Sequence, residues 1–265
     1  AHPYIVSVHA IHHNEQGEED EDDETSSNVL TSGKHADVAY MVMEMAERKY
    51  DAAKLSVAQA VHIVRCIATA LDHAHQNGVG HRDLKPENIL IYPKGQGSGQ
   101  NGIKVIDFGS SCYESERIYT YIQSRFYRAP EVILGAGYGM AIDMWSFACI
   151  LIELYNGLPV FPGENEHEQM ACFLEVLGRP PNSLLERSQR KRIFFDSRME
   201  PRQMINSRGR RRRINGKTIE KATTASDSLF IDFIKRCLDW EPNTRMTPMQ
   251  AIKHEWISKN RARKE

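Results

Sequence analysis

Residues 80–92, GHRDLKPENILIY, place an acid, a lysine and an amide at fixed intervals before an apolar run. Asp83 could accept the proton of a hydroxyl group, and Lys85 could reach a transferring phosphate. Asn88 offers a neutral oxygen to Mg²⁺, which prefers oxygen ligands. The spacing predicts a loop for phosphoryl transfer to an alcohol. A surface loop ahead of a strand is the alternative for this match taken alone.

A second motif lies downstream, in IDFGSSC at residues 106–112. Asp107 would bind Mg²⁺ and connect it to the phosphates, Phe108 would pack inward, and Gly109 would let the backbone turn. A third motif, Ala-Pro-Glu, follows at 129–131. Three motifs in this order and spacing resemble the catalytic domain of protein kinases.

The stretch YTYIQSRFYRAPEVILG at 119–135 and the IDFGSSC motif together resemble the dual-specificity tyrosine-regulated kinases, the DYRK family. The resemblance runs from about residue 1 to 257. It implies an ATP- and Mg²⁺-dependent protein kinase with an α+β, kinase-like fold. Residues 1–46 would be a remnant of the small lobe with an acidic insertion at 14–28, and 47–265 the helical lobe, with a family insert at about 178–225.

The resemblance also assigns residues to the nucleotide. Met43 would be the gatekeeper, the Glu44 carbonyl and the Ala46 amide would bind adenine, and Leu90 would lie beneath it. Glu87 would also belong to the nucleotide-binding residues, and Asp107 would bind at the phosphate end of the nucleotide.

Two further assignments concern scaffolding. Glu131 would pair with Arg245 and hold the activation segment to the large lobe. Asp143, in a buried helix, would brace the catalytic loop.

Tyr121 matches the second tyrosine of the family's Y-x-Y, which is autophosphorylated before the mature enzyme phosphorylates serine and threonine. Arg125 and Arg128 would bind that phosphate through charge-assisted hydrogen bonds. Arg82 replaces the cysteine usual in the family and could add a third cation. The alternative is that Tyr121 is only a packed aromatic residue.

The family favours serine or threonine followed by proline, often with an upstream arginine, which Glu87 and Asn165 would meet. The Arg82 variant also leaves open a sister group of kinases acting in splicing or on homeodomain proteins. A non-catalytic pseudokinase is a further alternative, but it predicts decayed catalytic residues and none has decayed.

No glycine-rich flap, strand lysine or helix glutamate precedes the catalytic loop in this sequence. The glycine-rich run at 95–102 follows that loop and is interpreted as a hairpin connection. The chain is therefore interpreted as a fragment that binds ATP poorly and has negligible activity by itself, since losing one such contact typically costs about 10²–10³ in rate.

The composition excludes several other classes of protein. The chain has 265 residues, 41% of them hydrophobic, a net charge of −1 and five scattered cysteines. The cysteines predict a reducing compartment, cytoplasmic and/or nuclear, without a disulfide framework, and no segment is long enough for a membrane helix. A monomer is also expected. Seven acids at 18–24 predict a solvated loop or a docking site for basic partners. The basic run at 207–213 could be an import or docking signal, but its lack of interleaved aromatics argues against nucleic acid as a partner.

Apolar periodicity predicts the elements that position these motifs. Strands are expected at 4–11, 38–45, 89–92 and 103–106. Helices are expected at 56–77, 141–156 and 227–239, with another beginning at Thr247. Residues 178–225 are expected to be irregular.

Overall fold

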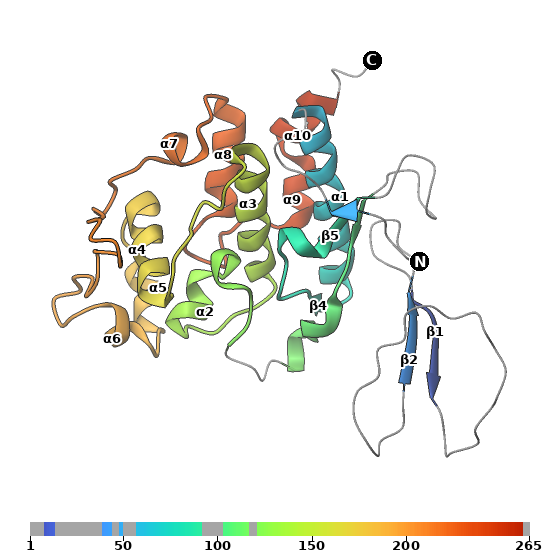
Figure 1. Ribbon diagram of the computed structural model, residues 1–265, viewed down its shortest axis with the longest axis horizontal. Coiled ribbons are helices and arrows are strands. Elements are labelled where there is room, and N and C mark those ends of the chain that lie inside the picture. The colour runs from blue at the N-terminus through green and yellow to red at the C-terminus, as the bar shows by residue number, and fades with distance from the viewer. Residues whose placement is uncertain are drawn as a thin grey trace.

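The computed structural model describes residues 8–13, 39–43, 48–49, 57–91, 103–116 and 121–261. Most of these form a helical body with few and short strands, as the predicted α+β class requires (Figure 1). Helix α3 (Ala141–Asn156) lies in its interior, with α1 (Val57–Gln76) packed on one side and α8 (Ser228–Cys237) on another.

Helix α3 has the predicted bounds because its sequence is apolar around almost its whole circumference. Twelve of its 16 residues are buried. Trp145 makes an edge contact with Phe173, with ring centroids 5.0 Å apart. The helix ends where Gly157 takes the left-handed conformation, φ 74°, which glycine adopts at little cost. The body is therefore built around a helix that carries one buried acid, Asp143.

The strands form three small antiparallel groups. Strand β1 (Val8–His13) pairs with β2 (Ala39–Met43), and the first strand extends two residues past its predicted end at residue 11. Strand β5 (Ile89–Ile91) pairs with β6 (Ile103–Val105), as predicted, and with β3 (Arg48–Lys49). Strand β4 (Val79–Gly80) pairs with β7 (Cys112–Tyr113). These last two groups hold the ends of the catalytic loop.

The C-terminal helices follow local capping signals. Helix α8 begins after Asp227, whose carboxylate accepts from the backbone N–H groups of Leu229 and Phe230. Helix α9 (Pro248–Lys253) begins with the predicted capping box between Thr247 and Gln250. Helix α10 (Glu255–Arg261) completes the chain's described part, and α1 packs against both α9 and α10.

Helix α4 (Glu166–Leu177) was not predicted, and the segment expected to be irregular contains three short helices. These are α5 (Asn182–Glu186), α6 (Lys191–Phe194) and α7 (Ile219–Thr223). The apolar stripe of α4 is interrupted by the buried polar residues Glu168, Gln169 and Glu175. The remaining elements are α2 (Pro130–Leu134) and the 3₁₀ turns η2 (Pro86–Asn88), η3 (Phe108–Ser110), η4 (Glu114–Glu116) and η5 (Arg125–Tyr127).

Several predictions lie outside the described residues: the acidic stretch 14–28, the connection 95–102, and the adenine contacts at Glu44 and Ala46. Met43 ends β2, but its side chain is also outside the description. All five cysteines are free thiols. In the part of the chain that the structure describes, no helix is long and apolar enough to cross a membrane.

Candidate active site

The catalytic loop is held by a carboxylate from the interior of the fold. Asp143 on α3 is fully buried and accepts hydrogen bonds from the backbone N–H groups of His81 and Arg82, at 2.8 and 2.9 Å. It also accepts from His75 Nε2 at 2.9 Å. Burial opposes ionisation, but these hydrogen bonds and nearby histidines lower the pKa of Asp143 below its usual range. The predicted brace is present, and His75 is a partner that sequence reasoning missed.

Asp83 is oriented from two sides. Its Oδ1 accepts from the backbone N–H and the hydroxyl of Ser124, at 2.9 and 2.8 Å. Its Oδ2 accepts from Lys85 Nζ at 2.6 Å. The hydrogen bond to Asp83 raises the pKa of Lys85, so the amine stays protonated. A base and a cation therefore lie side by side, fixed by a serine from the activation segment.

Asn88 is held with one amide atom engaged. Its Nδ2 donates to the Asp83 carbonyl oxygen at 2.9 Å, which leaves the amide oxygen as the atom for a cation. The Asn88 backbone carbonyl accepts from the Ile106 N–H at 2.9 Å, so the loop is joined to the segment that carries Asp107.

Asp107 and its neighbours depart from one sequence prediction. Asp107 itself takes the left-handed conformation, φ 62°, whereas Gly109 does not have positive φ. Asp107 Oδ1 accepts from the Gly109 N–H at 3.3 Å, and a Cβ on Gly109 would lie 3.2 Å from this oxygen. The glycine thus makes room for the carboxylate instead of reversing the backbone.

Phe108 ties this motif to the catalytic loop. It is partly buried against the core, and its ring lies 4.7 Å from that of His81. His81 Nε2 also contacts the Ile106 carbonyl oxygen at 2.9 Å. The two motifs are therefore in direct contact.

The donor set fits a hard divalent ion. It offers one amide oxygen from Asn88 and one exposed carboxylate from Asp107, leaving further positions for phosphate oxygens and water. Among the residues described, no three His, Cys, Asp or Glu side chains gather as a metal cluster.

The predicted buried pair connects the end of the activation segment to the C-terminal part. Arg245 donates from Nη1 and Nη2 to the two carboxylate oxygens of Glu131, at 2.7 and 2.9 Å. Both side chains are 0% exposed. Arg245 also donates to the Ala141 and Asp239 carbonyl oxygens, so the pair is well satisfied.

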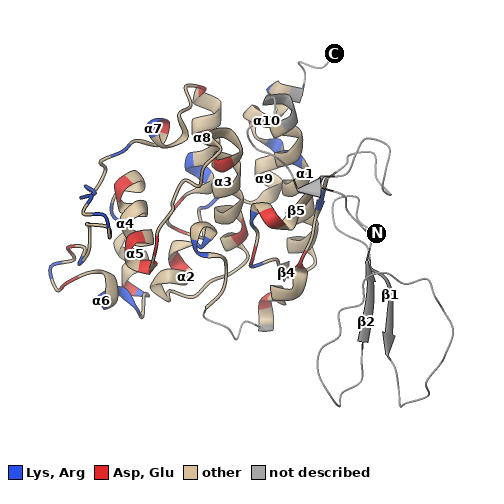
Figure 2. Cartoon of the chain, viewed as in Figure 1, with Lys and Arg blue, Asp and Glu red and all other residues tan. Residues whose placement is uncertain are grey.

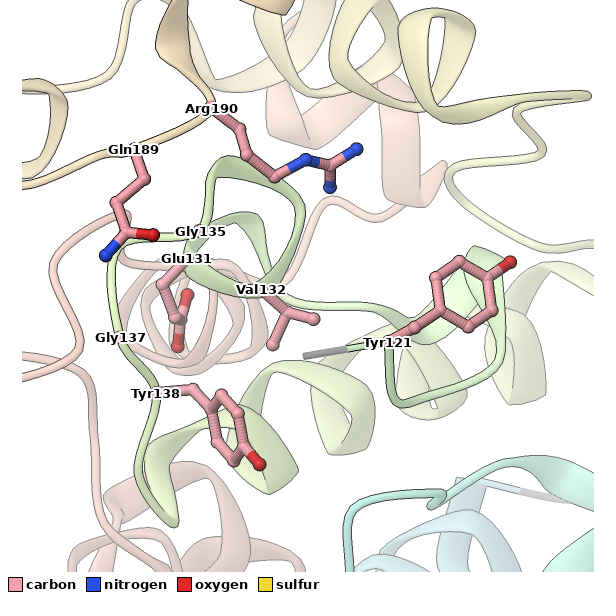
Figure 3. Close-up of a pocket in the computed structure, with 8 residues that line it drawn as sticks. All are labelled: Tyr121, Glu131, Val132, Gly135, Gly137, Tyr138, Gln189 and Arg190. Atoms are coloured by element: carbon pink, nitrogen blue, oxygen red, sulfur yellow. The ribbon is translucent and has the colours of Figure 1, made fainter. Parts of the chain in front are cut away.

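Tyr121 is 72% exposed, which disagrees with the alternative of a packed aromatic residue. The guanidinium of Arg128 lies 4.2 Å from its ring centroid. A hydrogen bond from Arg128, with the charges of Arg128 and Arg125, lowers the pKa of Tyr121. Tyr121 also borders an open cavity of about 690 Å³ walled by α2 and the segment before α6 (Figure 3). The phenol is thus reachable from solvent.

Arg128 is positioned mainly by backbone. Its Nε and Nη2 donate to the carbonyl oxygens of Ile122 and Gln123, at 2.9 and 2.8 Å. Its Nη1 faces Glu166 of α4 at 3.4 Å, and Glu166 in turn pairs with Arg190 at 2.7 Å. Two nitrogens of Arg128 are therefore bound to backbone, and the third, Nη1, is engaged only in a long ion pair with Glu166. Glu166 carried no signal in the sequence.

Gln123 supports the same segment. Its Nε2 donates to Ser146 Oγ at 2.8 Å, and its Oε1 accepts from the Ala129 N–H at 2.9 Å. Like Arg82 (φ 66°) and Asp107, it takes the left-handed conformation, with φ 63°.

Arg82 is 5% exposed and donates from Nη1 to Cys112 Sγ at 2.8 Å and to the Tyr138 hydroxyl at 3.3 Å. It lines one open cleft together with Asp83 and Tyr121. Glu87 lies within η2 and Leu90 within β5, next to the catalytic loop. Asn165 is the N-cap of α4 and accepts from the Glu168 N–H at 2.9 Å.

The basic run at 207–213 is not a free stretch. Arg208, Arg210 and Arg212 pair with Glu164 and with the α4 acids Glu175 and Glu168, and Arg212 is only 10% exposed. Arg210 and Arg212 thus fasten the segment to α4, while Arg208 faces Glu164, just before that helix.

The described geometry, a catalytic loop braced by a helix and joined to a second carboxylate, is that of a protein kinase domain. The family model for the protein kinase domain matches residues 1–257. Protein kinases as a class use ATP and a divalent metal.

Similar proteins indicate which family of protein kinases the chain resembles. The chain is 56% identical over 181 residues to human dual specificity tyrosine-phosphorylation-regulated kinase 4, an alignment covering 68% of this chain and 34% of that protein. It is 54% identical over 195 residues to Drosophila melanogaster dual specificity tyrosine-phosphorylation-regulated kinase 2. That alignment covers 74% of this chain and 26% of that protein. It is 50% identical over 197 residues to the DYRK-family kinase pom1 of Schizosaccharomyces pombe. That alignment covers 74% of this chain and 17% of that protein.

The chain belongs to the dual-specificity tyrosine-phosphorylation-regulated kinase family of protein kinases. It spans at most about a third of the length of these relatives.

Proposed function

We propose that the protein containing this chain transfers the γ-phosphoryl group of ATP to serine and threonine hydroxyls, and to its own Tyr121. The observation that carries this is the two-sided orientation of Asp83 by Ser124 and Lys85. A base fixed in this way can take up the proton of an attacking hydroxyl.

Each residue of the site has a different role in phosphoryl transfer. As the substrate oxygen bonds to the γ-phosphorus and the bond to the β–γ bridging oxygen breaks, the hydroxyl proton passes to Asp83. Lys85 places its positive charge beside the transferring group. Asn88 and Asp107 would hold Mg²⁺, which supplies charge neutralisation on the phosphates when bound. We also assign residues 47–265 to the helical lobe. The adenine contacts at Glu44 and Ala46, and the preference for a proline after the phosphorylated residue, are part of the same proposal.

Phosphorylation of Tyr121 is proposed to order the activation segment. The added phosphate carries about −1.5 to −2 charges and would meet Arg128 Nη1 and Arg125. The exposure of Tyr121 and the position of Arg128 against its ring support this assignment.

The test is made on the full-length protein with radiolabelled ATP, Mg²⁺ and a serine-proline peptide. Asp83→Asn should lower kcat by about 10²–10⁴ without lowering the melting temperature. Asp72→Asn on α1 is the matched control, because among the described residues this carboxylate accepts only from the side chain of Gln76, and it should keep full activity. Unchanged turnover in Asp83→Asn would overturn the proposal.

Two finer expectations accompany it. Residues 1–265 by themselves are expected to turn over ATP poorly, since this sequence holds no glycine-rich flap ahead of the catalytic loop. The protein is expected to be monomeric, in the cytoplasm and/or the nucleus, which sedimentation and localisation of a fluorescent fusion would test.

A further inference from the structure

The turn at residues 191–202 carries cations that the rest of the fold does not neutralise. Arginines close to this turn have acidic partners, namely Arg179 with Glu200, Arg187 with Glu241 and Arg190 with Glu166. Within the described residues, no ion pair joins an acid to Lys191, Arg192, Arg198 or Arg202. This surplus of positive charge would attract an anion from outside the chain.

The turn is a fixed structure. Phe195 and Pro201 form an antiparallel bridge, and the Arg202 N–H donates to the Phe194 carbonyl oxygen at 2.8 Å. Phe194 and Phe195 are each 2% exposed, so they anchor the turn in the core. The backbone is therefore organised before any ligand arrives, which lowers the entropy cost of binding.

A groove of about 380 Å³ opens on this turn. Its apolar wall is Phe195 and Met199, and its basic side chains are Lys191, Arg192 and Arg202, with Asp196 and Ser197 completing the lining. The volume suits one charged side chain with its flanking backbone, and it is too small for a folded domain.

The charges in the groove are arranged for an anion. Arg202 Nε donates to the carbonyl oxygens of Arg192 and Phe195, at 2.9 and 3.1 Å, which leaves its two terminal nitrogens for another acceptor. Asp196 Oδ1 is already engaged by the N–H groups of Arg198 and Glu200, at 2.8 and 2.9 Å.

The formal charge of the lining is three cations less one carboxylate, a surplus of two. A phosphate monoester carries nearly that charge at neutral pH, whereas one carboxylate carries half of it. Arginine forks also match phosphate oxygens in pairs.

The groove is distinct from the catalytic loop. In Figure 1, α6 lies at the edge of the helical body opposite the side where β4 and β5 hold that loop, and basic ribbon is visible beside α6 in Figure 2. A ligand here would not occupy the phosphoryl-transfer site.

We propose that this groove binds a phosphoserine or phosphothreonine in a protein segment, as an anchoring point separate from the catalytic loop. The proposal does not require that the chain be catalytically active, so it is tested by binding alone and can fail or succeed independently of the proposed function.

The test uses full-length Asp83→Asn protein, so that no phosphate is transferred, and fluorescence anisotropy. The probes are a degenerate peptide library with a central phosphoserine and the same library with serine. The phosphorylated library should bind at least about tenfold more tightly, and inorganic phosphate and phenyl phosphate should compete with it.

Lys191→Gln with Arg192→Gln is the informative variant, because neither side chain has a hydrogen-bond or ion-pair partner among the described residues and the fold should persist. It should remove the preference for phosphoserine. Arg211→Gln with Arg213→Gln is the matched control, since both arginines are exposed and lie outside the groove; it should keep the preference. Equal binding of the two libraries, or an unchanged preference in Lys191→Gln/Arg192→Gln, would overturn the proposal.

Discussion

Charged side chains serve opposite purposes in two parts of this kinase domain. In the scaffold behind the catalytic loop and the activation segment, the side chains of Glu131, Arg245 and Asp143 are completely buried, and each has hydrogen-bond partners at 2.7 to 3.0 Å. Around Tyr121 the phenol is 72% exposed, and Arg128 keeps one nitrogen only loosely engaged. The difference teaches that burial with full hydrogen bonding makes a charge part of the scaffold. Exposure with surplus charge leaves room for a later modification.

The largest effect is expected at the Glu131–Arg245 pair. Glu131→Gln should lower the free energy of unfolding by about 3–5 kcal/mol, because Arg245 stays buried without its counter-charge. Urea unfolding of the full-length protein measures this. The matched control is Glu200→Gln, which breaks an ion pair whose side chains are 45% and 56% exposed and should cost below about 1 kcal/mol. Similar losses in both variants would remove the distinction between the two kinds of charge.

Asp143→Asn should cost about 3 kcal/mol at neutral pH, since the amide cannot accept all the donors that Asp143 now meets. The pKa of Asp143 is lowered in the folded state, so its stabilisation is complete above the ordinary pKa of 3.8 and is lost as the pH falls further. The difference in unfolding free energy between wild type and variant should therefore shrink from pH 7 to pH 3. A difference that grows on acidification would contradict the sign.

Tyr121→Phe tests the exposed region. The hydroxyl that would carry phosphate is lost while the ring remains, so kcat/KM for peptide should fall by about tenfold with little change in melting temperature. Tyr113→Phe, at another exposed tyrosine (56%), should keep wild-type kinetics. Mass spectrometry of the wild type for phosphate on Tyr121 completes the measurement, and full activity in Tyr121→Phe would argue against the switch.

Arg82→Cys should have the smallest effect, a change in kcat below about threefold. The guanidinium contacts Cys112 and Tyr138 instead of the reacting groups, and the loop is held through backbone N–H groups that the substitution keeps. Steady-state kinetics beside Asp83→Asn check this. Equal losses in the two variants would mean that Arg82 does more than position the loop.

Local signals predicted the parts of the fold that depend on neighbours in the sequence. Helix α3 has continuous apolar character, and α9 begins with its own capping box, so both were located correctly. The catalytic motif predicted Asp83, Lys85 and Asn88 as one group, and the structure places them together. The nucleotide contacts at Glu44 and Ala46 stay predictions.

Distant partners explain what the sequence did not indicate. The buried acids of α4, Glu168 and Glu175, break its apolar period and are neutralised by Arg212, far along the chain. Ser124 and His75 orient the site through contacts across 41 and 68 residues. No local pattern encodes such pairings. The left-handed residue at Asp107 was missed because glycine is the usual candidate for that conformation.

The three non-glycine residues with positive φ around the site, Arg82, Asp107 and Gln123, have a consequence for how activity is acquired. Each such conformation costs about 1–3 kcal/mol and persists only while the surrounding packing enforces it. During denaturant titration, phosphotransfer should therefore disappear before the helical signal does. A collapsed chain with its helices formed but its interior loosely packed would be catalytically silent, so competence is among the last properties the domain gains as it folds.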